Sequence, residues 1–486
     1  MRPKSDSAAA NADSSASRRV ADGLPVTHGR LLDFPENPIR CMQRLHRAHG
    51  DIAALEEEGQ RLVFVFSPEY NQQVLSDGQT FHSRFFAVRG PRHSAQRRVT
   101  SGLLSMNGET HKEHRRMVMG PFQKRSIAHY HGPICQLTRD MLADWQPGEV
   151  RDMHAEMTHY MLRVTSAILF GLDVPEFALQ LGKMIDHWVE LNHETGMGAF
   201  VSDPRLLDNY DRLLAMGERL EQDLQQLVAL RRAGDRNGTD VLSLLLRAHG
   251  EEGRIDDTEL IGHVALLFAA AHLTTAHSLT WTLFLLAQHP SVMRALHEEL
   301  QTAVAGDAPT PDEVEGLPLL ERVVKESMRV LPASSYSQRI AAVPTRLGPF
   351  DLPAGCPVVF SQFISHHRAD RYEDPEAFRP ERWLTVRPTA YEYLPFGAGP
   401  RMCIGGPLAM KIIKATLPMV LKRFRLTMVP DSVVDGRVIS TMLGPRTSVP
   451  MQLAPPDGRF ESVPVRGNIH ELVDLRGMPR GRRAAA

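Results

Sequence analysis

The chain has 486 residues, of which 42% are hydrophobic and 23% are charged, and its formal net charge at pH 7 is −1. This composition is that of a globular protein, and a charge near zero excludes the general basic field that non-specific binding to nucleic acid or to an anionic membrane requires. The cysteines, Cys41, Cys135, Cys356 and Cys403, are too few and too far apart for a disulfide framework or a zinc site. We therefore expect a protein of a reducing compartment that binds no nucleic acid.

The N-terminal part combines a polar tail with a small sheet. Residues 1–22 are rich in Ala and Ser and contain no apolar run, which predicts a disordered tail and neither a signal peptide nor a membrane anchor. An amphipathic helix is predicted over residues 38–49, followed by strands at 52–55 and 62–66. Residues 80–108 are rich in Arg, Gly and Ser and read as irregular.

The middle of the chain is helical by pattern. Helices are expected over residues 109–192, with breaks at Pro133, Pro147 and Pro175, and over residues 206–230. A long helix then begins at Asp257 and ends near residues 289–290. Residues 260–293 contain no Asp, Glu, Lys or Arg but many His, Thr and Ser, so we expect a helix through a protein core and not a membrane span.

After Pro332 the sequence pattern changes. Short β-like runs lie between closely spaced prolines and glycines, and helices such as residues 410–424 separate some of these runs. Further helices are expected at 291–304 and 317–331, and strands at 438–453. The sequence therefore predicts a mainly helical fold with a small β-rich part. We expect one catalytic domain over residues 23–455 and a partly disordered extension over residues 456–486.

The segment from Phe396 to Gly405, Phe-Gly-Ala-Gly-Pro-Arg-Met-Cys-Ile-Gly, contains the most informative cysteine of the chain, Cys403. Glycines allow the backbone to turn close beneath a flat macrocycle, and freed N–H groups can point at the sulfur. Arg401 can offer a forked cation to a carboxylate, and Phe396 can shield the sulfur from water. The pattern indicates a thiolate ligand to haem iron. A phosphate loop is a weak reading, since no Gly-Lys-Ser/Thr follows.

This loop resembles that of the cytochrome P-450 superfamily, Phe-x-x-Gly-x-Arg-x-Cys-x-Gly, at every fixed position, and other family motifs follow in order from about residue 30 to about residue 455. The resemblance implies a cytochrome P-450 fold with non-covalent haem b, held by Cys403 in a loop that includes Gly405. It also implies a propionate-binding helix with His111 and Arg115, and a further propionate arginine at Arg339.

Two more motifs carry over from the family. The Glu-x-x-Arg of Glu326 and Arg329, with Arg382 from the segment Phe-Arg-Pro-Glu-Arg-Trp, implies an ionic lock that positions the cysteine loop. The stretch from Ala270 to Thr275 resembles the part of the long helix that delivers protons to dioxygen, with Thr274 as the alcohol. Here Ala271 replaces the usual glycine and Leu273 replaces the usual acid, which puts the ordinary proton relay in doubt.

The substrate pocket is expected where the family contacts its substrates. The candidate residues, drawn from the long helix, the segment after Pro332 and the C-terminal strands, are Phe268, Ala271, His272, Ala333, Tyr336 and Met442. They mix apolar groups with a few polar ones, as small-molecule pockets do.

The leading function is a monooxygenase that inserts one oxygen atom from dioxygen into an apolar or amphipathic small molecule. Because of Leu273, a peroxide-using oxygenase or an isomerase or dehydratase that skips dioxygen activation stays open. A non-catalytic haem sensor is a remote third reading.

The resemblance implies a ferredoxin or flavodoxin-type electron donor with its reductase, because the chain offers no flavin or nicotinamide fingerprint. We expect the donor to dock at the cysteine face, on a basic patch of Lys112, Arg116, Lys124, Arg125, Lys411 and Lys414. A cytoplasmic monomer is expected.

Overall fold

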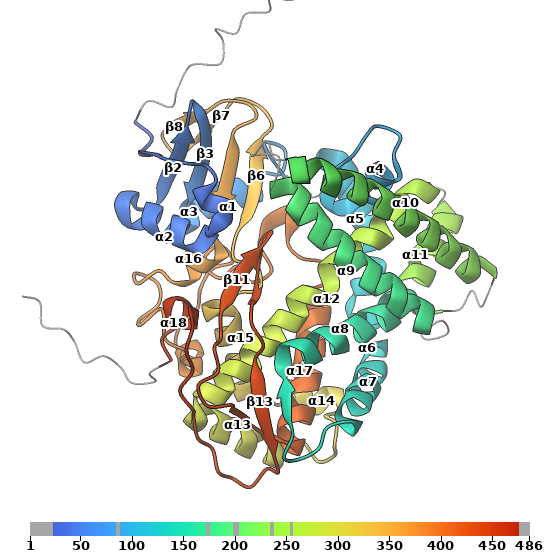
Figure 1. Cartoon of the computed structure of the whole chain (residues 1–486), viewed down its shortest axis with the longest axis vertical. Coiled ribbons are helices and arrows are strands. Elements are labelled where there is room, and N and C mark those ends of the chain that lie inside the picture. Colours follow the sequence, from blue (N-terminus) through green and yellow to red (C-terminus); the bar gives the residue numbers. More distant parts are fainter. Residues whose placement is uncertain are drawn as a thin grey trace, which may run out of the picture.

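The computed structural model describes residues 23–83, 88–171, 175–197, 204–233, 238–252 and 256–475. Figure 1 shows a β-rich part at the upper left and a larger helical part that fills the rest of the molecule. The predicted tail at residues 1–22 lies outside the described residues, as do residues 476–486. The expectation of a mainly helical fold with a small β-rich part is confirmed.

The β-rich part is built on a six-stranded sheet that joins N-terminal strands to two strands from residues 337–360. Its order is β1-β2-β3-β9-β6-β4, in which β1 and β2 are parallel, β3 and β9 are parallel, and the other neighbours are antiparallel. The strands are β1 (Val26–His28), β2 (Ile52–Glu57), β3 (Gln60–Val65), β4 (Phe81–Ser83), β6 (Ser337–Ala341) and β9 (Pro357–Phe360). The sequence pattern predicts β2 and β3 but not the three-residue edge strands β1 and β4, which are too short to show a periodicity.

Three smaller sheets complete the β structure of the described residues. They are the pair β7 (Thr345–Leu347) and β8 (Phe350–Leu352), the hairpin β11 (Gly436–Ile439) and β12 (Met442–Pro445), and the antiparallel set β10 (Arg425–Met428), β13 (Pro450–Ala454) and β5 (Val150–Asp152). β5 lies near Pro147, where sequence analysis expected only a break between helices.

The helices before the centre of the chain are α1 (Asp33–Glu36), α2 (Pro38–His49), α3 (Pro68–Ser76), α4 (Ala95–Val99), α5 (Gly108–Val118), α6 (Lys124–His129), α7 (His131–Ala143), α8 (Met153–Phe170), α9 (Pro175–Met197), α10 (Pro204–Ala233) and α11 (Val241–Glu252). Pro133 does not break a helix as expected. It lies in the first turn of α7, where a missing N–H costs nothing.

The later helices are α12 (Asp257–Gln288), α13 (Pro290–Ala303), α14 (Pro311–Glu315), α15 (Pro318–Val330), α16 (Gln362–His366), α17 (Gly406–Arg423) and α18 (Ile469–Leu472). Four short 3₁₀ segments matter for the site or its support: η1 (Leu103–Ser105), η2 (Gly120–Phe122), η4 (Pro380–Leu384) and η5 (Gly399–Arg401). η1 and α4 fall within the stretch that the sequence predicted to be irregular.

Helix α12 is the core helix of the molecule. It begins with a capping box, in which Glu259 N–H donates to Asp256 Oδ1 at 2.7 Å and Asp256 N–H donates to Glu259 Oε2 at 3.1 Å. By length and composition it could cross a membrane, but 67% of its most apolar stretch is buried inside the protein. Figure 1 shows it running through the middle of the helical part, so the prediction of a core helix is confirmed.

The chain continues as a folded extension (residues 456–475) beyond the expected domain end at residue 455. Val465, Ile469, Leu472 and Val473 are buried in it. Its backbone pairs with the segment just before β11, where Val434 N–H donates to Arg466 O at 2.8 Å. Asp474 N–H reaches Glu376 O, also at 2.8 Å. The folded body therefore includes the described part of this extension.

Candidate functional site

The loop before α17 presents Cys403 through a turn that favours glycine. Gly397 and Gly399 have φ angles of +68° and +69°, which side chains disfavour. A Cβ on Gly399 would lie 2.1 Å from Leu75 O, so no other residue fits there. Cys403 N–H donates to Phe396 O at 2.9 Å and closes the loop.

The Cys403 thiol is accessible from outside, yet it lies so deep among protein atoms that desolvation raises its pKa. The N–H groups of Gly405 and Gly406 donate to the sulfur and lower the pKa, as does the charge of Arg115. The Phe396 ring lies against Gly406, since a Cβ there would be 3.3 Å from it. Such a sulfur is suited to bind a metal ion as the thiolate, with N–H groups that tune its electron donation.

Four cationic or basic side chains from three separate segments converge near this loop: His111, Arg115, Arg339 and Arg401. Burial and the three arginines lower the pKa of His111 to about 4. Burial, Arg339 and Arg115 lower the pKa of Arg401 to about 9, and burial lowers that of Arg339 to about 10. Mutual repulsion of this kind indicates that an anion belongs among them.

Within the described residues, no carboxylate lies within 4.0 Å of the Arg115, Arg339 or Arg401 guanidinium groups. A macrocycle that carries carboxylates and an iron would supply both the missing anions and the partner of the sulfur. We name His111, Arg115, Arg339 and Arg401 the cation cluster. Its residues therefore fit haem.

Backbone carbonyl groups hold the cation cluster in place. Arg401 donates to Met106 O at 2.7 Å and to Leu104 O at 3.0 Å, and Arg115 donates to Met402 O at 2.6 Å. These carbonyl partners could not be predicted from the sequence, because backbone acceptors leave no signal in residue types. They join the segment around η1 and helix α5 to the cysteine loop.

The predicted ionic lock is present as a set of ion pairs. Glu326 accepts from Arg329 at 2.8 and 2.9 Å and from Arg382 at 2.8 Å, and both Glu326 and Arg329 are fully buried. Desolvation raises the pKa of Glu326, but Arg329 and Arg382 outweigh it and lower the pKa overall. Trp383 also donates its indole N–H to Glu326, at 2.9 Å, a contact that sequence analysis did not assign.

The lock reaches the neighbouring loops through Arg329. Its guanidinium donates to Pro375 O at 2.7 Å, to His366 O at 2.8 Å and to Ala377 O at 2.9 Å. The side chain of the same histidine accepts from Leu394 N–H at 2.7 Å, two residues before the cysteine loop begins. The lock is thus connected to that loop through one buried histidine.

Thr274 is half-buried on α12 and donates from Oγ1 to Ala270 O at 3.1 Å, one turn back. Ala270 is exposed although it lies in the middle of the core helix, so this face of α12 borders an open space. A threonine hydroxyl bonded in this way bends or loosens a helix and can exchange its partner for water.

Four of the six pocket candidates, Ala271, Ala333, Tyr336 and Met442, are partly accessible. The structure joins two of their segments, since Leu443 N–H donates to Ala333 O at 3.0 Å and the Tyr336 hydroxyl donates to Ser440 O at 2.6 Å. The hairpin of β11 and β12 therefore lies beside the segment that follows α15.

Phe268 and His272 do not line this space, contrary to expectation. Both are fully buried, and Phe268 stacks on Phe170 of α8 with ring centroids 5.1 Å apart. His272 bonds Phe268 O through Nδ1 at 3.3 Å and contacts Asp186 of α9 through Nε2. Two residues along a helix correspond to about 200° of rotation, so His272 faces away from Thr274.

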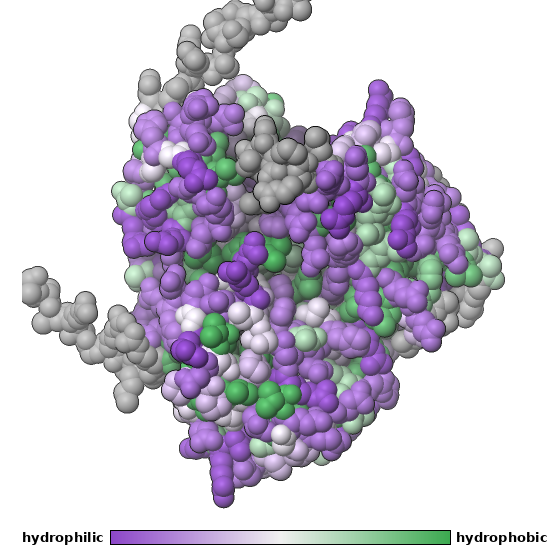
Figure 2. Space-filling model, viewed as in Figure 1, coloured by the Kyte–Doolittle hydropathy of each residue, from purple (hydrophilic) through white to green (hydrophobic). Residues whose placement is uncertain are grey.

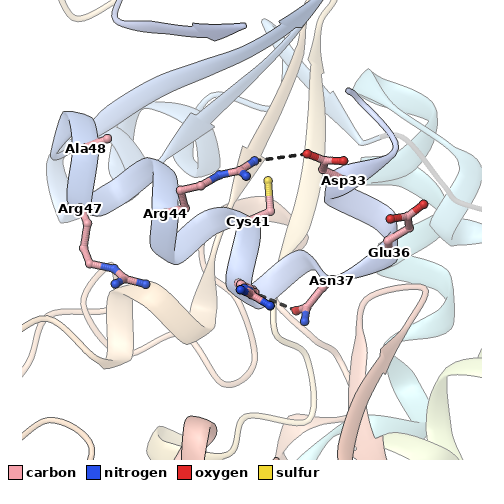
Figure 3. A pocket seen from close by; sticks show the side chains of 8 residues that line it. Asp33, Glu36, Asn37, Cys41, Arg44, Arg47 and Ala48 are labelled. Atoms are coloured by element: carbon pink, nitrogen blue, oxygen red, sulfur yellow. Dashed lines mark hydrogen bonds and ion pairs between the residues drawn. The ribbon is translucent and has the colours of Figure 1, made fainter. Parts of the chain in front are cut away.

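A separate surface recess of about 690 Å³ lies along α1 and α2 (Figure 3). Arg44 is 3.5 Å from Asp33, and Asn37 caps α2 by accepting from Arg40 N–H at 3.1 Å. Because acidic and basic side chains neutralise each other there, the recess does not have the apolar lining of a substrate pocket. Figure 2 instead shows apolar side chains in a hollow between the β-rich part and the helices on the right.

Comparison with known proteins agrees with this geometry. Residues 24–448 match the family model described as Cytochrome P450. The chain is 31% identical over 423 residues to cyclooctat-9-en-7-ol 5-monooxygenase of Streptomyces melanosporofaciens, a match that covers 85% of this chain and 90% of that protein. It is 28% identical to pentalenene oxygenase of Streptomyces avermitilis, with 88% and 95% covered. It is 29% identical to cyclooctatin synthase of S. melanosporofaciens, with 88% and 94% covered.

A family match over most of the chain, a cysteine loop of the required geometry and relatives that are oxygenases lead to one conclusion. The chain belongs to the cytochrome P450 family of oxidoreductases, is a monooxygenase, and uses haem iron held through a cysteine thiolate.

Proposed function

We propose that this monooxygenase binds haem b through Cys403 and inserts one oxygen atom from dioxygen into an apolar small molecule. The observation that carries this assignment is the cation cluster beside an accessible cysteine, because both need a partner that carries carboxylates and a metal. When bound, haem iron supplies the activation of oxygen, and thiolate ligation favours cleavage of the O–O bond.

The residues of the chain orient and protect this chemistry. Arg115, Arg339 and Arg401 neutralise the haem carboxylates, with His111 as a hydrogen-bonding partner. Phe396 limits the access of water to the sulfur. The ionic lock holds the cysteine loop in a fixed position. Thr274 holds or moves a proton at its Oγ1, for which its bond to Ala270 O is weak enough to exchange.

We propose an apolar substrate with an alkene skeleton. Two relatives carry names that refer to an alkene, pentalenene, and to an unsaturated alcohol, cyclooctat-9-en-7-ol. The accessible wall residues Ala271, Ala333 and Met442 are apolar, and Tyr336 has its hydroxyl already bonded to Ser440 O. Such a wall binds by shape and burial, and it offers few groups that would select a strongly polar molecule.

Protons must reach Thr274 by a route that does not include Leu273, because a leucine side chain can neither give nor accept a proton. His272 is no substitute, because its Nδ1 is bonded to Phe268 O and its Nε2 faces Asp186 on the far side of α12. We infer that protons reach Thr274 through ordered water or from a polar group of the substrate itself. An alcohol such as the one in the name of a relative would be able to serve in this way.

Leu273 also favours a second candidate, a haem-thiolate enzyme that uses peroxide or rearranges an oxygenated substrate. Such an enzyme needs no acid beside Thr274 and no electron donor.

For the leading function we propose a cytoplasmic monomer that receives electrons from an acidic ferredoxin or flavodoxin. Lys112, Arg116, Lys124 and Arg125 are exposed, and Lys411 is half-buried. Exposed Met119, directly after α5, and exposed Met402 of the cysteine loop supply apolar contact area. Lys414 is wrongly included in the expected patch, since it is buried and lies 3.5 Å from Glu321.

The experiment is product formation from alkene substrates under three regimes: NADPH with a ferredoxin and its reductase, hydrogen peroxide alone, and neither. Labelled dioxygen should place one labelled atom in the product in the first regime only. Product from peroxide alone, at the same rate and with no label from dioxygen, would favour the second candidate. Product without donor or peroxide would indicate rearrangement.

A further inference from the structure

A chain of polar side chains, two buried histidines and one half-buried glutamate, connects α5, α12 and the segment around η1. His263 of α12 is fully buried, and its Nδ1 accepts from Leu103 N–H at 3.1 Å. Its Nε2 lies 2.9 Å from Nδ1 of His114 on α5. Nε2 of His114 lies in turn 3.6 Å from Glu259 Oε1, which belongs to the capping box of α12.

The proton positions along this chain follow from its inner end. A backbone N–H can only donate, so Nδ1 of His263 carries no hydrogen and its Nε2 does. That N–H donates to His114 Nδ1, which places the hydrogen of His114 on Nε2, toward the Glu259 carboxylate. Burial, with a contribution from His114, lowers the pKa of His263 to about 3, so the ring is neutral at physiological pH, as this arrangement requires.

Such a chain does not conduct protons to the oxygen site. Nδ1 of His263 is occupied by an amide that cannot accept a proton, so a proton that entered at His114 would have no exit. The chain therefore acts by holding groups in place.

The chain of side chains holds in place the segments next to two members of the cation cluster, Arg401 and Arg115. One residue beyond Leu103, the carbonyl of Leu104 accepts from Arg401 at 3.0 Å. His114 directly precedes Arg115, which bonds the cysteine loop at Met402 O. His263 thus fixes the segment that carries the Arg401 acceptors. His114 fixes helix α5, which carries Arg115.

The contact between the η1 segment and α12 leaves no room for adjustment. A Cβ on Gly102 would lie 2.2 Å from Gly262 O, so the two backbones touch directly beside His263. With the backbones at this distance, the Leu103–His263 bond sets the rotation of the segment about its contact with α12.

We propose that His263, supported by His114, is a positioning residue for the cation cluster, and that its acceptance of the Leu103 N–H determines how tightly the haem carboxylates are held. The proposal rests on the proposed assignment of Cys403 and the cation cluster to haem. It concerns neither the iron ligand nor the substrate.

The test separates the two bonds of His263. In His263→Asn the side-chain oxygen can take the place of Nδ1 and accept from Leu103 N–H, while the bond to His114 is lost. In His263→Gln the amide can reach His114, while the acceptor for Leu103 is lost. The measurement is the rate of haem release from each holoprotein to an excess of apomyoglobin, together with the midpoint potential of the iron.

We expect His263→Gln and His263→Leu to release haem about tenfold or more faster than the unaltered protein, because a buried amide is left without an acceptor. His263→Asn should stay within about threefold of the unaltered protein, with an unchanged midpoint potential. A matched control is His289→Leu, which alters the buried histidine at the C-terminal cap of α12, bonded to Leu285 O at 2.7 Å and at the other end of the helix from His263. It should leave haem release unchanged.

Equal release rates in His263→Asn and His263→Gln would overturn the proposal, whether or not His263→Leu folds. So would equally fast release from His289→Leu, since the effect would then be general destabilisation. A failure of the haem assignment is distinguishable, because the unaltered protein would then show no thiolate-ligated haem spectrum at all.

Discussion

One carboxylate, Glu326, neutralises two buried arginines, and this residue makes the ionic lock sensitive to a single substitution. Glu326→Gln keeps the shape of the side chain but leaves Arg329 and Arg382 without a counter-charge. We expect a loss of about 3–5 kcal/mol in the free energy of unfolding and a lower yield of haem-loaded protein. Urea unfolding followed by circular dichroism measures the first quantity.

Helix α1 offers a control carboxylate on the surface. Glu36→Gln removes an exposed carboxylate that lies 3.3 Å from the exposed Arg30. It should cost about 1 kcal/mol or less. Similar losses in the two variants would show that the lock is not a special feature of stability.

For individual residues, the sequence was informative wherever the chemistry requires one particular type of side chain. It predicted Cys403 and the members of the lock by their motifs. It was wrong about Phe268 and His272, since helical spacing relates residues to one another but does not say which face turns toward the pocket. It also did not find His263, because a histidine in an apolar helix looks the same whether or not it is bonded.

At the scale of elements, the extension supports two parts of the site at once. Asn468 bonds β11 through Gly436, with distances of 2.7 Å from Gly436 N–H and 2.9 Å to Gly436 O. Asp474 bonds Glu376 O, next to the Ala377 carbonyl that accepts from Arg329. The extension therefore connects the hairpin of Met442 with the surroundings of the lock.

Removal of residues 463–486 should lower the thermal midpoint strongly and increase the fraction of haem that has lost its thiolate. The lost apolar side chains each contribute about 1.5–3 kcal/mol, a large share of a stability of about 5–15 kcal/mol. Removal of residues 476–486 alone leaves these contacts in place and should change neither quantity. An unchanged thermal midpoint in the chain that lacks residues 463–486 would contradict the supporting role assigned to the extension.

The exposed cations of α5 and α6 predict how electron transfer depends on charge. The double variant Lys124→Glu and Arg125→Glu should raise the KM for an acidic ferredoxin by roughly tenfold, with a smaller effect at high salt. Lys183→Glu on α9 also reverses an exposed cation and serves as the control. Turnover that is independent of salt, with equal KM values in both variants, would rule out docking at this surface.

For the whole molecule, buried neutral histidines predict sensitivity to acid. Burial lowers the pKa values of His263, His277 and His367 from 6.5 to about 3. The unfolded chain takes up these protons below pH 6.5 while the folded protein does not, so stability is complete above that pH and is lost as the pH falls toward 3. Each histidine contributes up to about 1.4 kcal/mol per pH unit in this window.

Urea unfolding at pH 7, 6 and 5 measures this slope directly. His277→Asn should flatten it, since one buried titrating group is gone. A free energy of unfolding that stays constant from pH 7 to pH 5 would contradict these proton affinities.

The sequence predicted the long elements of the fold well and the short ones poorly. The boundaries of α2 and α12 follow from an amphipathic stripe and from an uncharged run with an acidic cap, both of which are local signals. Strands such as β4 and β5 depend on partners far along the chain. The fold of residues 456–475 leaves little signal in the sequence, because their few apolar residues are widely spaced among polar ones.

The central claim, that Cys403 holds the haem iron as a thiolate, is tested most directly by the absorption spectrum of the reduced, carbon monoxide-bound protein. The account predicts the red-shifted Soret band of a thiolate-ligated haem, and its loss in Cys403→Ser, while Cys356→Ser, which alters a buried cysteine just before β9, retains it. An unchanged red-shifted band in Cys403→Ser would contradict the account.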